Sequence, residues 1–333
     1  MGRAMAERNA DNAARVLVVG GTHGNERNGV QLLEQWSLEP ESLDTAGLSV
    51  EFTLGNPGAI AACRRYLERD LNRSFAPDLL EGCLHQEEEV RRARELLALW
   101  GPEGARPCVV ALDLHSTTAA MGNCLVMYSR RPADLALAAG VQGRLGLPIY
   151  LHEGDDSQSG YLARRWPCGL AIEVGPVPQG VVNATICRQT QLALETALAV
   201  LAEARQGACR LPRHLVIHHH LRSLDLPRDG AGTPTARVHS LRQDRDWQPM
   251  VAGDCLFETL QGTTLHWEPA QGDPATVWPV FINEAAYEEK GIALSLTERR
   301  TWPADATWES ALVDLMQDHP SVSPSKKPPE GGF

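Results

Sequence analysis

The chain has 333 residues, of which 43% are hydrophobic and 22% charged, and its formal net charge is −11. This composition excludes wholesale disorder, and the length allows one large domain and a smaller one. The acidic excess argues against a general nucleic-acid or anionic-membrane surface, because both need clustered Lys and Arg. We therefore expect no nucleic-acid and no membrane partner, and an anionic ligand would have to be met by locally placed arginines.

The eight cysteines are scattered, with no Cys-x-x-Cys pair, and several lie in apolar runs. This pattern favours buried reduced thiols over a disulfide framework or a structural zinc knot. Residues 1–15 lack the apolar stretch of a signal peptide, and there is no run of about eighteen apolar residues that could span a membrane. The sequence predicts a cytoplasmic protein.

The first predicted element is a strand at residues 16–20 that runs into a glycine-rich turn. A Val-Leu-Val-Val run is typical of a strand buried on both faces of a sheet. The glycines allow a tight turn, after which His23 and Glu26 follow three positions apart. Such a pair suits a metal site, although it also fits a loop histidine beside a glutamate that begins a helix. The glycine spacing matches neither G-x-G-x-x-G nor a P-loop.

Strand and helix patterns then alternate, which predicts an α/β domain. From about residue 211 to 308, short β-branched and aromatic runs replace helical periodicity and predict a β-rich second domain. The three histidines at 218–220 suggest a metal patch, but alternation on an exposed strand face explains most such runs. Strands are predicted at 48–54, 108–115, 123–129, 148–152 and 169–175, and helices at 27–37, 57–66, 86–100, 133–144 and 183–205.

His115 is the candidate for a third metal ligand. It ends a predicted strand as His23 nearly does, and ligands gather at the carboxyl ends of strands in open α/β sheets. Two nearby ligands and a distant third are common in catalytic zinc sites. Asp113, two residues earlier on the same side of the strand, suits an orienting role. Taken alone, His115 fits a core histidine bonded to the backbone equally well.

Two further segments carry polar groups suited to a site. Residues 64–75 have little apolar periodicity, and their guanidinium and amide groups can bind a carboxylate in two-pronged fashion; a solvated basic turn is the alternative. Glu173 lies inside an apolar strand, where a carboxylate pairs with a cation or has its pKa raised, as a general base near a metal requires. The polar residues of the first segment are Arg65, Arg69, Asn72 and Arg73.

Five motifs in order resemble the aspartoacylase family, which belongs with the zinc carboxypeptidase-like and succinylglutamate desuccinylase-like amidohydrolases. The resemblance covers about residues 16–300, and the chain is most similar to a bacterial member, with cyanobacteria as the candidate source. It implies a three-layer α/β/α domain with a mixed central sheet and a smaller β-rich C-terminal domain. The motifs are GGTHGNE, C-x-RY-x-x-x-DLNR at 63–73, DLHSTTAAMG at 113–122, IEVGPVPQG at 172–180 and FINEAAYEEKGIA at 281–293.

The resemblance also implies a role for each matching residue. Arg65 would polarise the scissile carbonyl, and Glu173 would be the general base and later the acid. One Zn²⁺ per subunit would be held by three ligands, and Tyr287 would reach the substrate from the second domain. The metal ligands would be His23, Glu26 and His115, and the substrate contacts would be Arg65, Asn72, Arg73, Glu173 and Tyr287.

The expected domain limits follow from the same comparison. Residues 1–14 would be a flexible N-terminus, 15–209 the zinc hydrolase domain, 210–318 a β-rich domain that caps the active site, and 319–333 a disordered tail rich in Pro, Gly and Lys.

The implied activity is hydrolysis of an anionic N-acyl-L-amino acid, with N-acetyl-L-aspartate as the leading substrate. Members selective for acyl-aspartate carry a further arginine in the region matching about 159–165, where this chain offers Gly160, with Arg164 or Arg165 as substitutes. Aromatic, mercapturic or succinylated acyl amino acids are therefore alternative substrates. A zinc-binding scaffold on a degenerate hydrolase fold is the non-enzymatic alternative, and a homo-oligomer remains open.

Overall fold

The computed structural model describes residues 14–82, 84–153 and 159–317. Residues 1–13 of the expected flexible N-terminus and the expected disordered tail lie outside this part. In the first two thirds of the chain the elements are β1 (Arg15–Gly20), α2 (Arg27–Leu38), η1 (Pro40–Ser42), β2 (Ser49–Leu54), α3 (Pro57–Ala62), η2 (Leu71–Arg73), α4 (Pro77–Leu80), α5 (Glu88–Trp100), β3 (Val110–Ser116), β4 (Asn123–Met127), α6 (Pro132–Leu145), β5 (Ile149–Leu151), η3 (Leu162–Arg165), β6 (Cys168–Val174) and α7 (Ala184–Arg205).

The last third of the chain is rich in strands, as its short β-branched runs predict. Its elements are β7 (His214–Asp225), β8 (Ala236–Val238), β9 (Met250–Val251), β10 (Cys255–Thr259), β11 (Thr264–His266), β12 (Thr276–Val280), η4 (Ala285–Lys290), β13 (Ile292–Pro303) and α8 (Ala306–Met316).

The predicted strands and helices are present, with one clear difference. The helix expected to run from Pro57 to about residue 66 stops at Ala62. Cys63 then takes a left-handed conformation with φ 50°, and its N–H caps the helix by bonding to Ala59 and Ile60 carbonyls. Because the helix ends here, the chain can turn and bring Arg65 back towards the end of β1.

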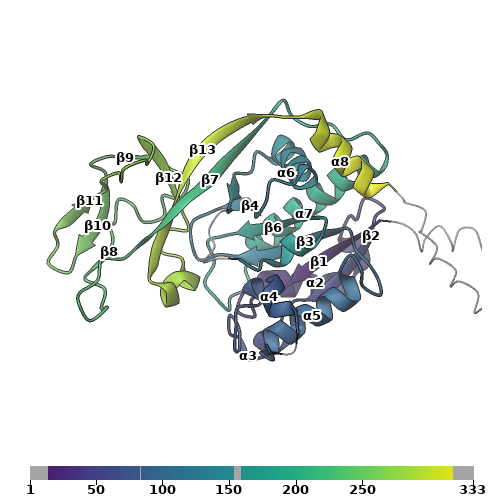
Figure 1. Ribbon diagram of the computed structural model, residues 1–333, viewed down its shortest axis with the longest axis horizontal. Coiled ribbons are helices and arrows are strands. Elements are labelled where there is room, and N and C mark those ends of the chain that lie inside the picture. The colour runs from purple at the N-terminus through teal and green to yellow at the C-terminus, as the bar shows by residue number, and fades with distance from the viewer. Residues whose placement is uncertain (1–13, 83, 154–158, 318–333) are drawn as a thin grey trace, which may run out of the picture.

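A ten-stranded sheet organises the molecule, in the order β2-β1-β3-β6-β4-β5-β7-β13-β12-β9. The four strands β2, β1, β3 and β6, which are neighbours in this order, are parallel, whereas β4 runs antiparallel to β6. The sheet is therefore mixed, as the resemblance implies. Four of the C-terminal strands, β7, β13, β12 and β9, continue this large sheet, because β7 pairs with β5. A second sheet, β11-β10-β8, forms a lobe at the far end of the long β7–β13 pair (Figure 1).

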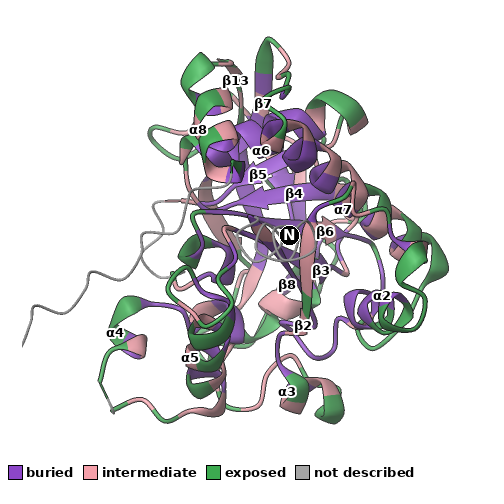
Figure 2. Ribbon diagram, turned by 90° about the vertical axis from the view of Figure 1, so that its right-hand side faces the viewer, coloured by how far each residue is buried: buried purple, intermediate pink, exposed green. Residues whose placement is uncertain are grey.

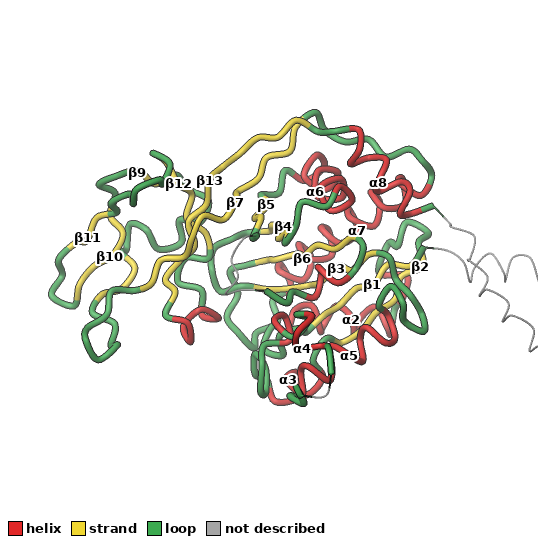
Figure 3. The backbone as a smooth tube through the Cα atoms, viewed as in Figure 1, coloured by secondary structure: helices red, strands yellow, loops and turns green. Residues whose placement is uncertain are grey.

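Helices cover both faces of the sheet in the part formed by β1–β6, which explains why β1, β3 and β6 lack polar alternation. In β1, Val16 and Val18 belong to a buried cluster that also contains residues of α2, α6, α7 and α8, whereas Leu17 and Val19 point to the opposite face and belong to a cluster with residues of α5. Figure 2 shows the strands buried at the centre and exposed residues on the outer sides of the helices. The helices surround β1–β6, while the lobe with β8, β10 and β11 consists of strands and loops (Figure 3). The result is the three-layer α/β/α arrangement.

Cysteine and membrane features can be stated for the described residues. The seven cysteines that the structure describes are all free thiols, and burial raises the pKa of the Cys108 thiol to about 12. Across 14–82, 84–153 and 159–317, none of the helices combines the length and the apolar character needed to cross a bilayer.

Candidate active site

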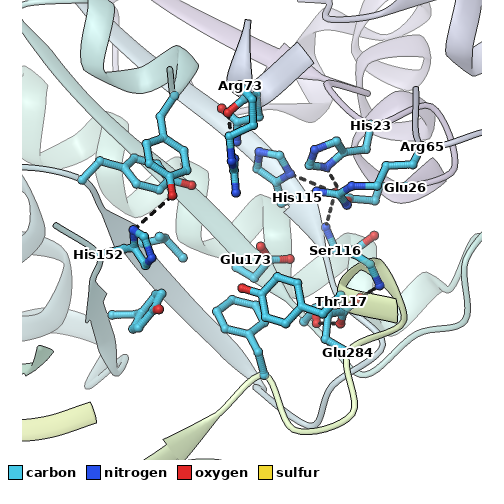
Figure 4. Close-up of a pocket in the computed structure, with 18 residues that line it drawn as sticks. His23, Glu26, Arg65, Arg73, His115, Ser116, Thr117, His152, Glu173 and Glu284 are labelled. Atoms are coloured by element: carbon cyan, nitrogen blue, oxygen red, sulfur yellow. Dashed lines mark hydrogen bonds and ion pairs between the residues drawn. The ribbon is translucent and has the colours of Figure 1, made fainter. Parts of the chain in front are cut away.

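The eight residues to which the family resemblance gives a role line one pocket at the carboxyl ends of β1, β3 and β6 (Figure 4), whereas Arg69 lies outside this pocket and pairs with Glu87. The sheet brings the segments together because β3 lies between β1 and β6. The η4 segment of the C-terminal region closes the pocket from the other side and contributes Tyr287. The remaining members are His23, Glu26, Arg65, Asn72, Arg73, His115 and Glu173.

His23, Glu26 and His115 form a compact buried cluster. One ligand atom from each lies within 4.8 Å of the others, and all three side chains are buried. The turn after β1 can approach the backbone of α3 closely because residue 24 is glycine. A Cβ there would lie 2.1 Å from the carbonyl carbon of Ala59. The glycine-rich turn therefore lets His23 and Glu26 meet His115.

The two imidazoles are oriented for metal binding by carboxylates behind them. His23 Nε2 lies 3.0 Å from Asp70 Oδ1, and His115 Nε2 lies 2.7 Å from Asp113 Oδ2. Each imidazole thus lies between two carboxylates, and with a metal bound each Nε2 would donate to its aspartate and leave Nδ1 free to coordinate. Both Nδ1 atoms face Glu26, at 2.6 Å from His23 and 2.9 Å from His115. Asp113 thus takes the orienting position expected of it.

Glu26 is held as an anion at the centre of this cluster. Burial on its own would raise its pKa, but His23 and His115 bring the pKa of Glu26 well below its usual range. The backbone N–H of Ser116 also donates to Glu26 Oε2, at 3.0 Å. The site thus brings together one carboxylate and two imidazoles, which can bind a metal when neutral. This is a donor set found in zinc sites.

Arg65 lies directly beside the cluster. Its guanidinium donates to Glu26 Oε1 at 3.3 Å and to Asp70 Oδ2 at 3.1 and 3.3 Å. Burial would lower its pKa, but Asp70 and Glu26 together raise the pKa of Arg65 above its ordinary value. The guanidinium is therefore a permanent positive charge next to the His23–Glu26–His115 cluster.

Glu173 stands next to His115 across the sheet. The two residues are in register in the parallel pair of β3 and β6, so their side chains leave the sheet on the same side. The carboxylate is partly open to the pocket but otherwise enclosed by protein, and this burial raises the pKa of Glu173 well above its ordinary value, against the opposing effect of His115. A carboxyl group with a raised pKa holds a proton more readily than an ordinary glutamate, as a group that accepts and later returns a proton requires.

Asn72, Arg73 and the segment at 160–162 are fastened together. Leu162 N donates to Asn72 Oδ1 at 2.9 Å, and Phe75 N donates to the Gly160 carbonyl at 3.1 Å. The guanidinium carbon of Arg73 lies 4.4 Å from the ring centroid of Tyr161. Asn72 and Arg73 therefore reach the pocket on a turn that is held by the segment at 160–162, which leads into β6.

The region near 159–165 supplies the pocket with Tyr161 rather than an arginine. Arg164 and Arg165 are exposed, and neither lines this pocket. Gly160 has φ +80°, and a Cβ there would lie 2.5 Å from the Arg73 carbonyl oxygen, so the position has no room for a side chain. The sequence did not indicate Tyr161, since its approach depends on contacts with the distant turn at 72–75.

Glu284 is a further pocket residue that sequence reasoning missed. Its Oε2 accepts from the N–H groups of Thr118 and Ala119, at 2.8 and 3.1 Å, and from the hydroxyls of Thr117 and Thr118. Its Oε1 accepts from Ala286 N at 3.0 Å. The signal in the sequence was an acidic residue three positions before Tyr287, within the FINEAAY motif. The contacts tie the C-terminal segment to the loop that follows His115.

Comparison with known proteins shows the family to which the chain belongs. Residues 12–201 match the succinylglutamate desuccinylase/aspartoacylase catalytic domain model, and residues 213–299 match the AstE/AspA barrel-sandwich hybrid domain model. The chain belongs to the succinylglutamate desuccinylase/aspartoacylase family. The implied fold and the suggested cyanobacterial likeness are thereby confirmed.

Two relatives of this family are described as probable aspartoacylases. One, from Parasynechococcus marenigrum (strain WH8102), is 59% identical over 90% of this chain and 98% of its own; the other, from Prochlorococcus marinus (strain MIT 9313), is 53% identical over 91% and 98%. The solved structure of murine aminoacylase 3 superposes with a TM-score of 0.80, at 36% identity, over 88% of this chain and 97% of its own. The family's named members thus include deacylases, and membership supports deacylation of N-acyl amino acids as the class of reaction.

Proposed function

We propose that this protein is a zinc-dependent amidohydrolase that converts N-acetyl-L-aspartate and water to acetate and L-aspartate. The observation that carries the proposal is the placement of Glu173 and Arg65 around the His23–Glu26–His115 cluster. One carboxylate of raised pKa and one permanent cation flank a three-ligand site, as metal-assisted hydrolysis requires.

The protein fits zinc through its donor chemistry. Two imidazoles and one carboxylate leave a fourth position for water or substrate, as in other catalytic zinc sites. When bound there, zinc would supply Lewis-acid chemistry, which polarises a carbonyl and makes water more acidic. Asp70 and Asp113 would keep both imidazoles in the coordinating orientation.

The remaining steps are carried by side chains of the chain itself. Glu173 would take a proton from the attacking water as the new C–O bond forms at the amide carbonyl. Arg65 would stabilise the negative charge that develops on the carbonyl oxygen. Glu173 would then deliver its proton to the amide nitrogen, so that the C–N bond breaks and the amine leaves neutral.

The side of the pocket that Arg73 occupies is suited to bind the α-carboxylate of the substrate. Asn72 and Arg73 are adjacent on the turn that Leu162 N and Tyr161 anchor, so a guanidinium is fixed in the pocket. An α-carboxylate bound there would place the acyl carbonyl towards Arg65 and the ligand cluster. Tyr287 lines the opposite, C-terminal side and would close over the substrate.

N-acetyl aromatic amino acids are a second candidate substrate class. The pocket wall contains three tyrosines from the catalytic domain, and Phe281 and Tyr287 from the C-terminal region. Such a wall offers stacking surface to an aromatic side chain. Of the described lining residues, Arg65 and Arg73 are the two that carry a guanidinium or ammonium group, so a second carboxylate has no further arginine or lysine to meet it.

A substrate panel tests the proposal directly. We expect the zinc-loaded protein to hydrolyse N-acetyl-L-aspartate with a higher kcat/KM than N-acetyl-L-tyrosine or N-succinyl-L-glutamate, and chelation to abolish the activity until zinc is restored. Release of the free amino acid would be measured, with metal content determined on the same samples. A preference for acetyl-tyrosine would select the second candidate, and no hydrolysis by zinc-loaded protein would favour a binding scaffold.

The pH profile should show an acid limb set by Glu173. Because burial raises the pKa of this carboxyl, it stays protonated to higher pH than an ordinary glutamate and cannot serve as a base there. We expect kcat/KM to rise with pH through this raised pKa, above the ordinary value of about 4.3. Metal content measured across the same range separates this limb from metal loss. Activity that stayed constant down to about pH 4.3 would contradict the prediction.

A further inference from the structure

Residues 281–284, here called the strap, are a strained stretch of backbone that forms the C-terminal side of the pocket. The strap follows β12 and leads into η4, so it brings Phe281, Glu284 and, one turn later, Tyr287 to the pocket lining. Phe281 has φ 52° and Asn283 has φ 55°, in the left-handed region that favours glycine. Strained residues of this kind persist only where the surrounding structure holds them, so the contacts of the strap determine the position of the pocket wall.

The turn at 244–247 contacts both the strand before the strap and the catalytic domain. Trp247 N donates to the Pro279 carbonyl of β12 at 2.9 Å, and Trp247 Nε1 donates to the Met121 carbonyl at 2.8 Å, in the loop that follows β3. The strap meets the same methionine, because Phe281 N lies 3.3 Å from Met121 Sδ. The turn therefore joins the strap region to the catalytic domain.

Asp246 is the residue of this turn that binds the middle of the strap. Its Oδ1 accepts from the N–H of Ile282 at 3.1 Å, and Ile282 lies between the two left-handed residues. Both Asp246 and Ile282 are buried. Two other N–H groups of the strap bind Met121 Sδ and the Ala293 carbonyl, so the bond from Ile282 is the one that depends on an ionisable side chain. Its loss would leave a buried donor unpaired where the backbone is strained.

The surroundings of Asp246 favour its neutral form. Its Oδ2 is buried and has no hydrogen-bond partner among the described residues. Burial raises the pKa of Asp246 to about 7, against the opposing hydrogen bonds from backbone N–H groups such as that of Ile282, and Asp244 adds to the rise. An exposed aspartate ionises near its ordinary pKa of about 3.9, so the buried group keeps its proton over a range in which an exposed one does not.

The other charged and titratable groups near Asp246 come from its own turn, the strap, β4 and β7. Burial lowers the pKa of His218, whose ring packs on Trp247, to about 4, and burial also raises the pKa of the Cys124 thiol well above its ordinary value. Neither group therefore changes its charge between about pH 5 and 7. Of the remaining groups, Asp244 and Arg245 are exposed, Arg242 donates to Asp254, and Glu284 is bonded to the loop at 117–119.

We infer that Asp246 is a positioning residue of the active site, which holds the strap and with it the C-terminal wall of the pocket, and that this hold weakens as the pH rises. With the strap in place the neutral carboxyl is favoured, whereas release of the strap would expose the group and let it ionise at its ordinary pKa. Release therefore becomes easier from about pH 4 to about 7 and constant above that, where both states are ionised. The expected effect on catalysis, but not the contact itself, rests on the proposed deacylase function.

Hydrogen exchange of backbone amides tests the contact without a substrate. In the zinc-loaded protein, the protection of a peptide covering 278–287, corrected for the intrinsic exchange rate, should fall up to about tenfold per pH unit between about pH 5 and 7, because one proton is lost on release. Asp246→Asn keeps an acceptor for Ile282 N but cannot ionise, so its protection should stay constant. Asp244→Asn is the matched control and should keep the wild-type slope, since Asp244 is exposed and asparagine tolerates its φ of 60°.

Steady-state kinetics of the same positions test the effect on the pocket. Asp246→Ala leaves Ile282 N unpaired and should raise KM for N-acetyl-L-aspartate about 2- to 10-fold, with a smaller change in kcat. The split is expected because the strap forms the wall, whereas Glu173 and Arg65 come from other segments. Asp246→Asn should restore most of the lost binding.

These measurements separate the contact from the proposed function. The same pH slope in the wild type and Asp246→Asn would overturn the inference, as would an unchanged KM in a folded Asp246→Ala protein. An equal loss of protection in peptides of β1 and β3 would show a general loss of stability and would overturn it too. If Asp246→Ala does not fold, the slopes of the wild type and Asp246→Asn decide. A zinc-loaded wild type that hydrolyses none of the panel substrates would overturn the deacylase, while hydrogen exchange still decides the contact.

Discussion

Glu173→Gln is expected to lower kcat about 10²- to 10⁴-fold, because general acid–base catalysis contributes that much in enzymes of known mechanism. Glutamine keeps the shape and polarity of the side chain but cannot take a proton from water. The carboxylate lies in register with His115 and faces the ligand cluster, so its loss should affect the chemical step and not the assembly of the site. KM for N-acetyl-L-aspartate and zinc content should change little.

Steady-state kinetics and metal analysis of the same preparation check this prediction. Glu288→Gln is the matched control, since Glu288 is an exposed glutamate of η4 and the same chemical change is made outside the pocket. An undiminished kcat in zinc-loaded Glu173→Gln would show that another group is the base. A loss of bound zinc in that variant would instead indicate that Glu173 supports the ligand cluster.

The ligand cluster could be anticipated from sequence because each member stands beside a strong local signal. His23 and Glu26 follow a buried strand and its glycines, and His115 lies near the end of another buried strand. Parallel strands bring their carboxyl ends to one edge of a sheet, so three residues separated by up to 92 positions share one site. Strand identity was enough to bring the three residues together, whereas their assignment as ligands came from the family resemblance.

The pocket wall could not be anticipated in the same way. Tyr161 enters the pocket because Gly160 and Leu162 bond to the turn at 72–75, and this contact has no periodic pattern in the sequence. His152 lies on the short segment after β5, where a buried polar residue is indistinguishable from a loop residue by composition. Arg164 and Arg165 show the opposite case, as their charge suggested a binding role that their exposure does not support.

The C-terminal strands illustrate a limit of domain reading from composition. The change at about residue 211 was visible because helical periodicity fades there. The pairing of β7 with β5 was not, since one sheet can continue across a change of composition. The consequence is functional: the strand pair β7–β13 fixes the position of the η4 segment, which carries Glu284 and Tyr287 into the pocket.

Glu284→Ala is expected to lower the free energy of unfolding by about 1–3 kcal/mol, because that is the cost of leaving a buried donor such as the Ala119 N–H unpaired. The carboxylate accepts from the N–H groups of Thr118 and Ala119 through one oxygen and from Ala286 N through the other. These donors come from the loop after His115 and from η4, and alanine offers none of them an acceptor.

The same substitution should lower kcat/KM beyond its effect on stability. With the clamp removed, the segment that carries Tyr287 would no longer be fixed to the loop at 116–119, so the wall over the substrate would lose its position. Two measurements separate these effects. Urea unfolding gives the loss of stability, and steady-state kinetics at a temperature where the variant stays folded give the loss of activity. Glu288→Ala, on the exposed side of η4, is the control. A folded Glu284→Ala protein with full activity would mean that closure by the C-terminal region does not depend on these bonds, and the capping role would then rest on packing between Phe281 and Tyr287, whose rings lie 5.7 Å apart.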